Sequence, residues 1–407
     1  MAEGAESAPG ARWFAWSVGL AALVQLALFA AATAPGLAGT SDSGFYLHAA
    51  GTLREAGRLL NPDGSAYRYW PPLYPALVAL MGSPSGVRVL HGACLVASLV
   101  AWSRLGRWLL PGPGAAVLPW AVALSTPWLV VSKFVWGEVA FLALFAGYAG
   151  ALFQWWRTRQ GGWFALAAGL GFLLPLQRTA GFFLLAGVGA GLLLETRKQP
   201  KQWAPLTGHF ALTVLGGLAW HYYALLLAAP SVYKLNRGWP QFFSSAADYG
   251  FVLSRWLLPV KAAWRPELSL LWALALVGIL MLLWPQRPRG PVAESPSGNE
   301  LPSATRFLRV LWTSTVVFVL LLIISTTFTR SAAGLHDAER YASVLFAPVV
   351  VLAVHRVAGQ AGRPGLPQLA RLVVMGVVGF WLLYSAGRAV SNVAALRKLP
   401  PLTLQAR

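Results

Sequence analysis

The stretch WFAWSVGLAALVQLALFAAAT, Trp13–Thr33, has no charged side chain and is long enough to cross a lipid bilayer. A spanning helix needs about 20 mostly apolar residues, because each residue advances about 1.5 Å through a hydrocarbon core about 30 Å thick. Similar runs recur to the end of the 407-residue chain, which is 57% hydrophobic and 11% charged. Soluble domains have about 25% charged residues, so this composition indicates a polytopic membrane protein.

The apolar runs predict an all-α transmembrane bundle of about eleven spanning helices, which forms one integral membrane domain over residues 1–407. We interpret residues 34–86 and 228–267 as long loops on one side of the membrane, and residues 285–305 as a solvated linker on the other. The predicted spans are Trp13–Thr33, Val87–Leu105, Ala115–Val131, Phe134–Trp156, Trp163–Leu176, Gly181–Leu194, Leu206–Leu227, Leu268–Trp284, Phe307–Thr327, Tyr341–His355 and Leu372–Ser385.

The net charge of +19 comes from Lys and Arg residues that cluster in the segments between apolar runs. In a soluble protein this charge would suggest a nucleic-acid partner, but here it is typical of topology signals and of contacts with lipid headgroups. The positive-inside rule predicts a cytoplasmic N-terminus and places residues 34–86 on the extracytoplasmic side. Arg388, Arg397 and Lys398 depart from the rule, because the predicted helix count places these basic residues on the extracytoplasmic side too.

Cysteine and histidine usage excludes several kinds of site. Cys94 is the only cysteine, so the chain can form neither an internal disulfide framework nor a cysteine-based zinc site. The six histidines are scattered without metal-binding spacing, so we expect no histidine-based metal site.

The first long loop begins with GTSDSGFYLHAAGTLREAG, Gly39–Gly57, and contains Asp42, one of only 13 acidic residues. Ser41 or Asp42 is a suitable N-cap, and apolar residues follow at helical spacing. This pattern predicts an amphipathic surface helix that ends with the stretch. Aromatic residues then precede Pro71-Pro72 and a short apolar segment, Leu73–Met81. Because that segment is too short to span the membrane, it is predicted as a second surface helix.

The order of these features resembles that of the C-type glycosyltransferase superfamily, which includes protein mannosyltransferases and aminoarabinose transferases. The resemblance lies in a first spanning helix, an Asp at the start of the next loop, a surface helix and an aromatic Pro-Pro segment. It is closer in the N-terminal half of the chain than in the C-terminal half. The motifs that carry it are Tyr69-Trp70-Pro71-Pro72-Leu73-Tyr74-Pro75, Trp136-Gly137-Glu138, Gln177-Arg178-Thr179-Ala180-Gly181 and Glu339-Arg340-Tyr341.

The resemblance implies a multi-pass enzyme of the plasma (inner) membrane with an extracytoplasmic active site. Such an enzyme transfers a sugar from a polyprenyl-phosphate donor to an acceptor glycan, lipid or protein, with inversion at the anomeric carbon. In this family the acidic residue of the first outer loop is catalytic, and Asp42 matches it. A carboxylate can take the proton of an attacking hydroxyl, which contributes about 10²- to 10⁴-fold to a rate. Alternatively, Asp42 is only a helix cap worth about 1 kcal/mol.

The sequence departs from the family pattern at this position. Many relatives carry two acidic residues here, whereas this chain has Ser41-Asp42-Ser43. A metal-bridged donor is therefore in doubt: no metal ligand is predicted, and a divalent metal stays an open alternative as the only cofactor. We expect the donor, the acceptor and the lipid bilayer as partners, and no nucleic acid.

Three other charged residues are candidates for the same site. Glu138 is either a supporting carboxylate or a structural partner of Lys133 or Arg178, because an ionised carboxylate at the bilayer centre costs about 2.5 to 3.5 kcal/mol. Arg178 and Arg340 either bind the donor phosphate, which a guanidinium holds in a bidentate fork, or anchor the protein to anionic headgroups. Weaker candidates for substrate contacts are Tyr46, His48, Tyr69, Trp70, Tyr74, His336, Asp337 and Glu339.

Two other functions stay open from the sequence alone. A transporter or flippase of lipid-linked sugars would also need outward-facing carboxylates and arginines, although transporters usually show inverted repeats that this sequence lacks. A non-catalytic assembly subunit related to these enzymes would keep the fold without the chemistry.

Overall fold

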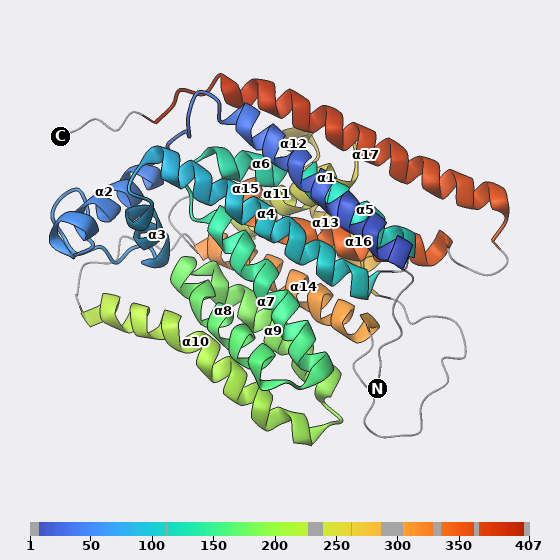
Figure 1. The fold of residues 1–407 in the computed structure, drawn as a ribbon, viewed down its shortest axis with the longest axis horizontal. Helices are drawn as coiled ribbons and strands as arrows, with labels where there is room; N and C mark the ends of the chain where they lie inside the picture. The colour runs from blue at the N-terminus through green and yellow to red at the C-terminus, as the bar shows by residue number, and fades with distance from the viewer. Residues whose placement is uncertain are drawn as a thin grey trace.

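The computed structural model describes residues 8–110, 112–226, 239–261, 263–285, 304–328, 335–361 and 366–402. These residues form a bundle of helices, and the described part of the chain has no β-strand beyond two isolated bridges (Figure 1). Within that part, seven helices are long and apolar enough to cross a membrane, and three shorter apolar helices accompany them. The predicted polytopic all-α fold is confirmed, and the chain is an integral membrane protein.

The helix boundaries follow the apolar runs of the sequence. Each predicted span falls on a helix, but the span Ala115–Val131 is divided at Ser125, whose side chain caps a new helix by accepting a hydrogen bond from the Trp128 amide at 3.3 Å. The helices are α1 Ala8–Ala32, α2 Ser41–Ala56, α3 Leu73–Met81, α4 Pro84–Leu109, α5 Gly112–Ala123, α6 Thr126–Lys133, α7 Glu138–Thr158, α8 Gly161–Gln177, α9 Ala180–Thr196, η1 Pro200–Gln202, α10 Trp203–Leu226, α11 Trp239–Leu257, α12 Trp264–Glu267, α13 Ser269–Leu282, α14 Ala304–Phe328, α15 Leu335–Ala342, η2 Ser343–Leu345, α16 Phe346–Ala361 and α17 Gln368–Arg397.

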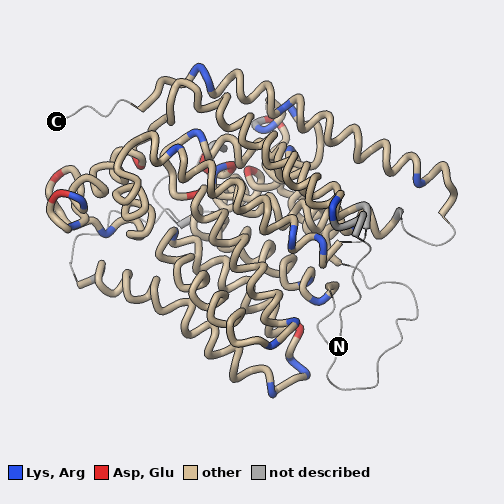
Figure 2. Tube along the Cα trace, viewed as in Figure 1, with Lys and Arg blue, Asp and Glu red and all other residues tan. Residues whose placement is uncertain are grey.

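The interior of the bundle is built on α7, which packs against α4 and α8 and is buried along most of its length. Small residues bring other helices close together. A Cβ atom on Gly187 of α9 would lie 2.7 Å from the Ser314 Cα atom of α14, so no larger residue fits there. Close backbone approach replaces the hydrophobic drive that lipid cannot supply. Figure 2 shows that long stretches of the helices carry no charge, and that charged residues gather near helix ends.

The first loop forms a small layer of surface helices, α2 and α3, at one end of the bundle (Figure 1). α3 has the predicted bounds, and α2 ends at Gly57, which is in the left-handed region with φ of 66°. The prediction of Ser41 or Asp42 as N-cap is wrong. Thr40 has the extended backbone of an N-cap, and its amide donates to Ser43 Oγ at 3.0 Å, so Asp42 lies in the first helical turn.

The segment predicted as the second long loop contains a helix of its own. α11 packs against α13, α14 and α15, and every residue from Ser245 to Ser254 is buried. The sequence does not predict α11, because polar residues such as Asp248 interrupt the apolar pattern. Asp248 Oδ1 accepts from Arg265 Nε at 2.7 Å, so the charge is paired where it lies. Most of the predicted linker 285–305 lies outside the described residues.

The C-terminal helix α17 returns to the end of the bundle that carries the first loop. It runs beside α1, and the Leu402 amide donates to the Leu37 carbonyl at 2.7 Å. Arg397 and Lys398 therefore lie at the same end as α2, as the predicted helix count requires. The side of the membrane that this end faces stays a prediction from the positive-inside rule.

Candidate active site

Four charged residues predicted for the site come together at the end of the bundle near α2. Arg340 Nη1 donates to Asp42 Oδ2 at 2.7 Å, and Arg340 Nε donates to Glu138 Oε1. Arg178 Nη1 lies 2.6 Å from the same Glu138 oxygen. The residues come from α2, the start of α7, the α8–α9 connection and α15, so the fold assembles the cluster from distant parts of the chain.

Backbone hydrogen bonds hold Asp42 in its place. The Ala38 amide donates to the Lys133 carbonyl at 2.8 Å, and the Val135 amide donates to the Ala38 carbonyl at 3.0 Å. Ser43 Oγ then donates to the Val135 carbonyl at 3.0 Å. The start of α2 is thereby tied to the connection between α6 and α7, which leads directly into Glu138.

The Arg340 guanidinium rests on an aromatic surface. Its central carbon lies 4.1 Å from the Trp136 ring centroid, and Phe134 stacks on the other side of that ring with centroids 4.3 Å apart. Trp136 Nε1 donates to Thr40 Oγ1 at 2.8 Å. Because a cation over an indole face is attracted by the ring quadrupole, two carboxylates and one ring together fix the guanidinium.

Glu138 is fully buried and shares its Oε1 atom between two guanidinium groups. Its predicted alternative partner, Lys133, lies elsewhere: Lys133 Nζ donates to the Ala32 carbonyl at 3.1 Å and the Gly36 carbonyl at 2.8 Å. A cation there stabilises the carbonyls that the C-terminus of α1 leaves unpaired. Glu138 therefore pairs with Arg178 and Arg340, and not with Lys133. Its Oε2 atom has no hydrogen-bond partner among the described residues.

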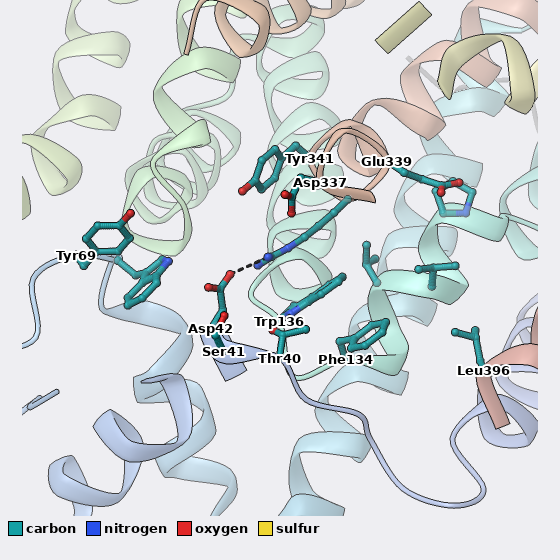
Figure 3. A pocket seen from close by; sticks show the side chains of 15 residues that line it. Thr40, Ser41, Asp42, Tyr69, Phe134, Trp136, Asp337, Glu339, Tyr341 and Leu396 are labelled. Carbon is teal, nitrogen blue, oxygen red and sulfur yellow. Dashed lines mark hydrogen bonds and ion pairs between the residues drawn. The ribbon is translucent and has the colours of Figure 1, made fainter. Parts of the chain in front are cut away.

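A cavity of about 590 Å³ opens beside the cluster (Figure 3). Six of the residues predicted for the site line it: Asp42, Tyr69, Trp70, Asp337, Glu339 and Arg340. Figure 3 shows Asp42 facing Asp337 and Tyr341 across the cavity, with Leu396 at its far end. The lining also contains five apolar side chains: Pro127, Val130, Val131, Phe134 and Leu396. The cavity thus presents charged and apolar side chains together.

The other predicted residues whose side chains the structure describes do not line this cavity. Tyr46 and Tyr74 are buried in an aromatic cluster beneath it, with ring centroids 5.1 Å apart, and Tyr74 Oη forms a hydrogen bond with His91 Nε2 at 2.9 Å. Burial raises the pKa of both tyrosines, which stay neutral at any physiological pH. His48 is exposed on α2, and the His336 side chain lies outside the described residues. Arg178 is connected to the site by its ion pair with Glu138.

The sequence reasoning did not select several residues that shape the site. The Trp136 ring lies under the Arg340 guanidinium. Trp136 directly precedes Gly137-Glu138 in one of the motifs, and this position could have indicated its role from the sequence. Thr40 and Ser41 could have been inferred from their nearness to Asp42. Nothing in the sequence points to Leu396, which reaches the cavity from the last helix.

The described residues do not offer a ligand set for a resident metal ion. No three His, Cys, Asp or Glu side chains in that part of the chain lie close enough to hold one. Arg340 Nη1 lies 2.7 Å from Asp42 Oδ2 and brings positive charge to the cavity.

Known proteins resemble this chain in fold only. No known family profile matches the sequence, and no curated protein does. The solved structure of the oligosaccharyltransferase of Archaeoglobus fulgidus, tethered to an acceptor peptide, superposes with a TM-score of 0.55 at 13% identity. That match covers 97% of this chain and 56% of the other, so this chain spans little more than half the length of that enzyme.

ArnT from Cupriavidus metallidurans also matches. Its structure bound to undecaprenyl phosphate gives a TM-score of 0.44 at 14% identity over 86% of this chain and 78% of ArnT. Its apo structure gives 0.44 at 13% identity over 87% and 79%. This chain therefore shares the fold of that oligosaccharyltransferase, and the predicted resemblance is confirmed at the level of fold.

Proposed function

We propose that this protein is a membrane glycosyltransferase that moves a hexose or pentose from a polyprenyl-phosphate donor to an extracytoplasmic acceptor. The observation that carries the proposal is the cavity, whose lining combines Asp42 and Arg340 with apolar side chains. Such a lining suits an amphiphile whose anionic head and sugar meet the charged side chains while its chain meets the apolar ones.

Asp42 is the residue that we assign to the acceptor. Its side chain is 25% exposed, so it is open to a ligand, whereas Glu138 is fully buried. In the proposed step the acceptor hydroxyl oxygen attacks the anomeric carbon, and Asp42 takes the hydroxyl proton. The bond between the anomeric carbon and the phosphate oxygen breaks, and its electron pair leaves with polyprenyl phosphate. Attack opposite the leaving group inverts the anomeric carbon, and the carboxylate also stabilises its developing positive charge.

Arg340 is the residue that we assign to the leaving phosphate. It lines the cavity, and a guanidinium has five N–H donors, of which two are used by Asp42 and Glu138. The others can meet phosphate oxygens as negative charge develops on them. Glu138 holds this guanidinium at one edge, and Arg178, which also binds Glu138, contributes positive charge behind it.

The experiment that separates an enzyme from a transporter uses the purified protein in liposomes. We expect a panel of radiolabelled polyprenyl-phosphate hexoses and pentoses, given with a cell-envelope extract as acceptor, to release polyprenyl phosphate. Release must depend on the protein and match the label gained by the acceptor. Movement of the lipid between leaflets without cleavage would favour the flippase, and neither movement nor cleavage would favour an assembly subunit.

A further inference from the structure

The last described residues of the chain lie across the segment that leads to Asp42. The Leu402 amide donates to the Leu37 carbonyl at 2.7 Å, so the C-terminal tail, Pro401–Leu402, pairs with the segment Gly36–Gly39. Thr40, the N-cap of α2, follows that segment directly, and Asp42 follows in the first turn. The contact of Leu402 with Leu37 therefore restrains the backbone directly before Asp42, the candidate base.

Two glycines make room for the tail. A Cβ atom on Gly39 would lie 2.1 Å from Leu402 Cδ1, so the end of the Leu402 side chain would have to move away from the segment. A Cβ atom on Gly36 would lie 3.0 Å from Pro401 Cβ, and Gly36 has φ of 121°, a conformation that favours glycine. The two surfaces are complementary at both positions.

The opposite edge of the same segment is also held. The Ala38 amide donates to the Lys133 carbonyl at 2.8 Å, and Lys133 Nζ donates to the Gly36 carbonyl at 2.8 Å. The segment Gly36–Gly39 therefore runs between the α6–α7 connection on one side and the C-terminal tail on the other. Removal of the tail would leave it held from one side only.

The tail is fixed where it begins. Most of α17 is exposed at the surface of the bundle, but Leu396 is buried against Ala32 and Leu129, and Leu399 packs beside them. Leu396 also lines the cavity. The end of α17 thus forms part of the cavity wall and then carries Pro401 and Leu402 onto the segment before Asp42.

We propose that Leu402 and Pro401 are positioning residues that hold Asp42 in reach of its substrate. This inference rests on the proposed function, because it takes Asp42 as the base. A displacement of about 1 Å in a reacting group can cost up to about 10²-fold in rate. The tail touches the backbone before Asp42 and none of the charged residues of the cluster, so its loss affects the rate of the chemical step more than donor binding.

The test uses two substitutions that should correct each other. Gly39→Ala pushes the Leu402 side chain off the segment, and we expect it to lower kcat by up to about tenfold with donor KM nearly unchanged. Leu402→Ala removes the clashing side chain, so the double variant should turn over faster than Gly39→Ala alone. Leu402→Met, which keeps the bulk, should stay close to wild type. Gly51→Ala, on the open side of α2 with nothing within 4 Å, is the matched control and should have no effect.

A second readout does not depend on catalysis. In a Cys94→Ser background, Ser41→Cys reports on the segment through its rate of reaction with a maleimide, and Leu402→Ala should raise that rate. Kinetic effects of Gly39→Ala and Leu402→Ala that multiply without rescue, or an unchanged labelling rate, would overturn the inference. If Asp42→Asn keeps full turnover, the assignment of Asp42 as the base fails, and the labelling rate alone still decides whether the tail holds the segment. If the wild-type protein cleaves no donor, the proposed function itself fails.

Discussion

Arg340 Nη1 lies 2.7 Å from Asp42 Oδ2, although the two residues are 298 positions apart in the chain. The contact joins the first loop to the start of the helix pair α15–α16, and Glu138 and Trp136 fix the same guanidinium from two other sides. The charge at this end of the cavity is therefore set by an assembled cluster of two carboxylates and two arginines. The predictions below separate what each member does.

Glu138→Gln should destabilise the protein as well as inactivate it. The variant leaves two guanidinium groups without their shared carboxylate in a buried place, and removal of one partner from a buried pair costs about 3 to 5 kcal/mol. Thermal unfolding in detergent measures the loss. Glu195→Gln breaks the pair with Arg309, whose atoms are 3.6 Å apart and partly exposed, and should cost less than about 1 kcal/mol. Equal effects of the two variants would contradict the role given to Glu138.

Arg340→Lys should lower turnover even though the positive charge is kept. An ammonium group cannot donate to Asp42, to Glu138 and to a phosphate in the planar geometry of a guanidinium, and it stacks less well on Trp136. We expect a loss of about 10²-fold in kcat/KM, comparable to the loss of one donor to developing charge. Arg265→Lys, in the pair with Asp248 that does not line the cavity, is the control. Wild-type kinetics in Arg340→Lys would show that only the charge matters.

Trp136→Phe and Trp136→Leu should differ. Phenylalanine keeps a ring under Arg340 but loses the hydrogen bond to Thr40, whereas leucine loses both. A neutral hydrogen bond contributes about 1 kcal/mol and a desolvated cation–π contact up to about 2 kcal/mol. We therefore expect leucine to lower turnover more than phenylalanine in the liposome assay. Equal losses in the two variants would indicate that the Thr40 contact, and not the ring, is the important one, and a smaller loss for leucine would contradict the role given to the ring.

Val130→Ser should weaken binding of the donor without slowing its conversion. Val130 is one of the apolar residues that line the cavity. Each buried methylene contributes about 0.8 kcal/mol, so the donor KM should rise by about tenfold for a long-chain donor. A short-chain analogue that does not reach Val130 should be unaffected. Val89→Ser, at a position 70% exposed on α4, should change neither value. An equal rise in KM for both donors would place the chain elsewhere.

Much of the fold could be predicted from the sequence, because apolar length alone determines a spanning helix. The short helix Leu73–Met81 and the end of α2 at Gly57 followed from proline, glycine and helical spacing. α11 was overlooked because its polar residues are paired by contacts that only the fold creates. The break at Ser125 has a signal in the sequence, because Thr126 and Pro127 follow it and a proline in the first turn favours the start of a helix.

The site could be predicted as a set of residues but not as an arrangement. Asp42, Glu138, Arg178 and Arg340 were selected by charge and motif, and the structure brings all four together. The sequence could not show that Arg340 bridges both carboxylates, or that Lys133 turns toward the end of α1. These outcomes depend on how distant helices pack, as does the position of Leu402 on the segment before Asp42.

The most direct measurement of the central claim is the turnover of Asp42→Asn with a labelled polyprenyl-phosphate sugar in liposomes. Asparagine keeps the shape of the side chain and can still lie beside Arg340, but it cannot accept the hydroxyl proton, so release of polyprenyl phosphate should fall by about 10²-fold or more. Asp63→Asn, the same change at an exposed turn of the same loop, should leave release unchanged. Release at the wild-type rate by well-folded Asp42→Asn protein would contradict the assignment of Asp42 as the base.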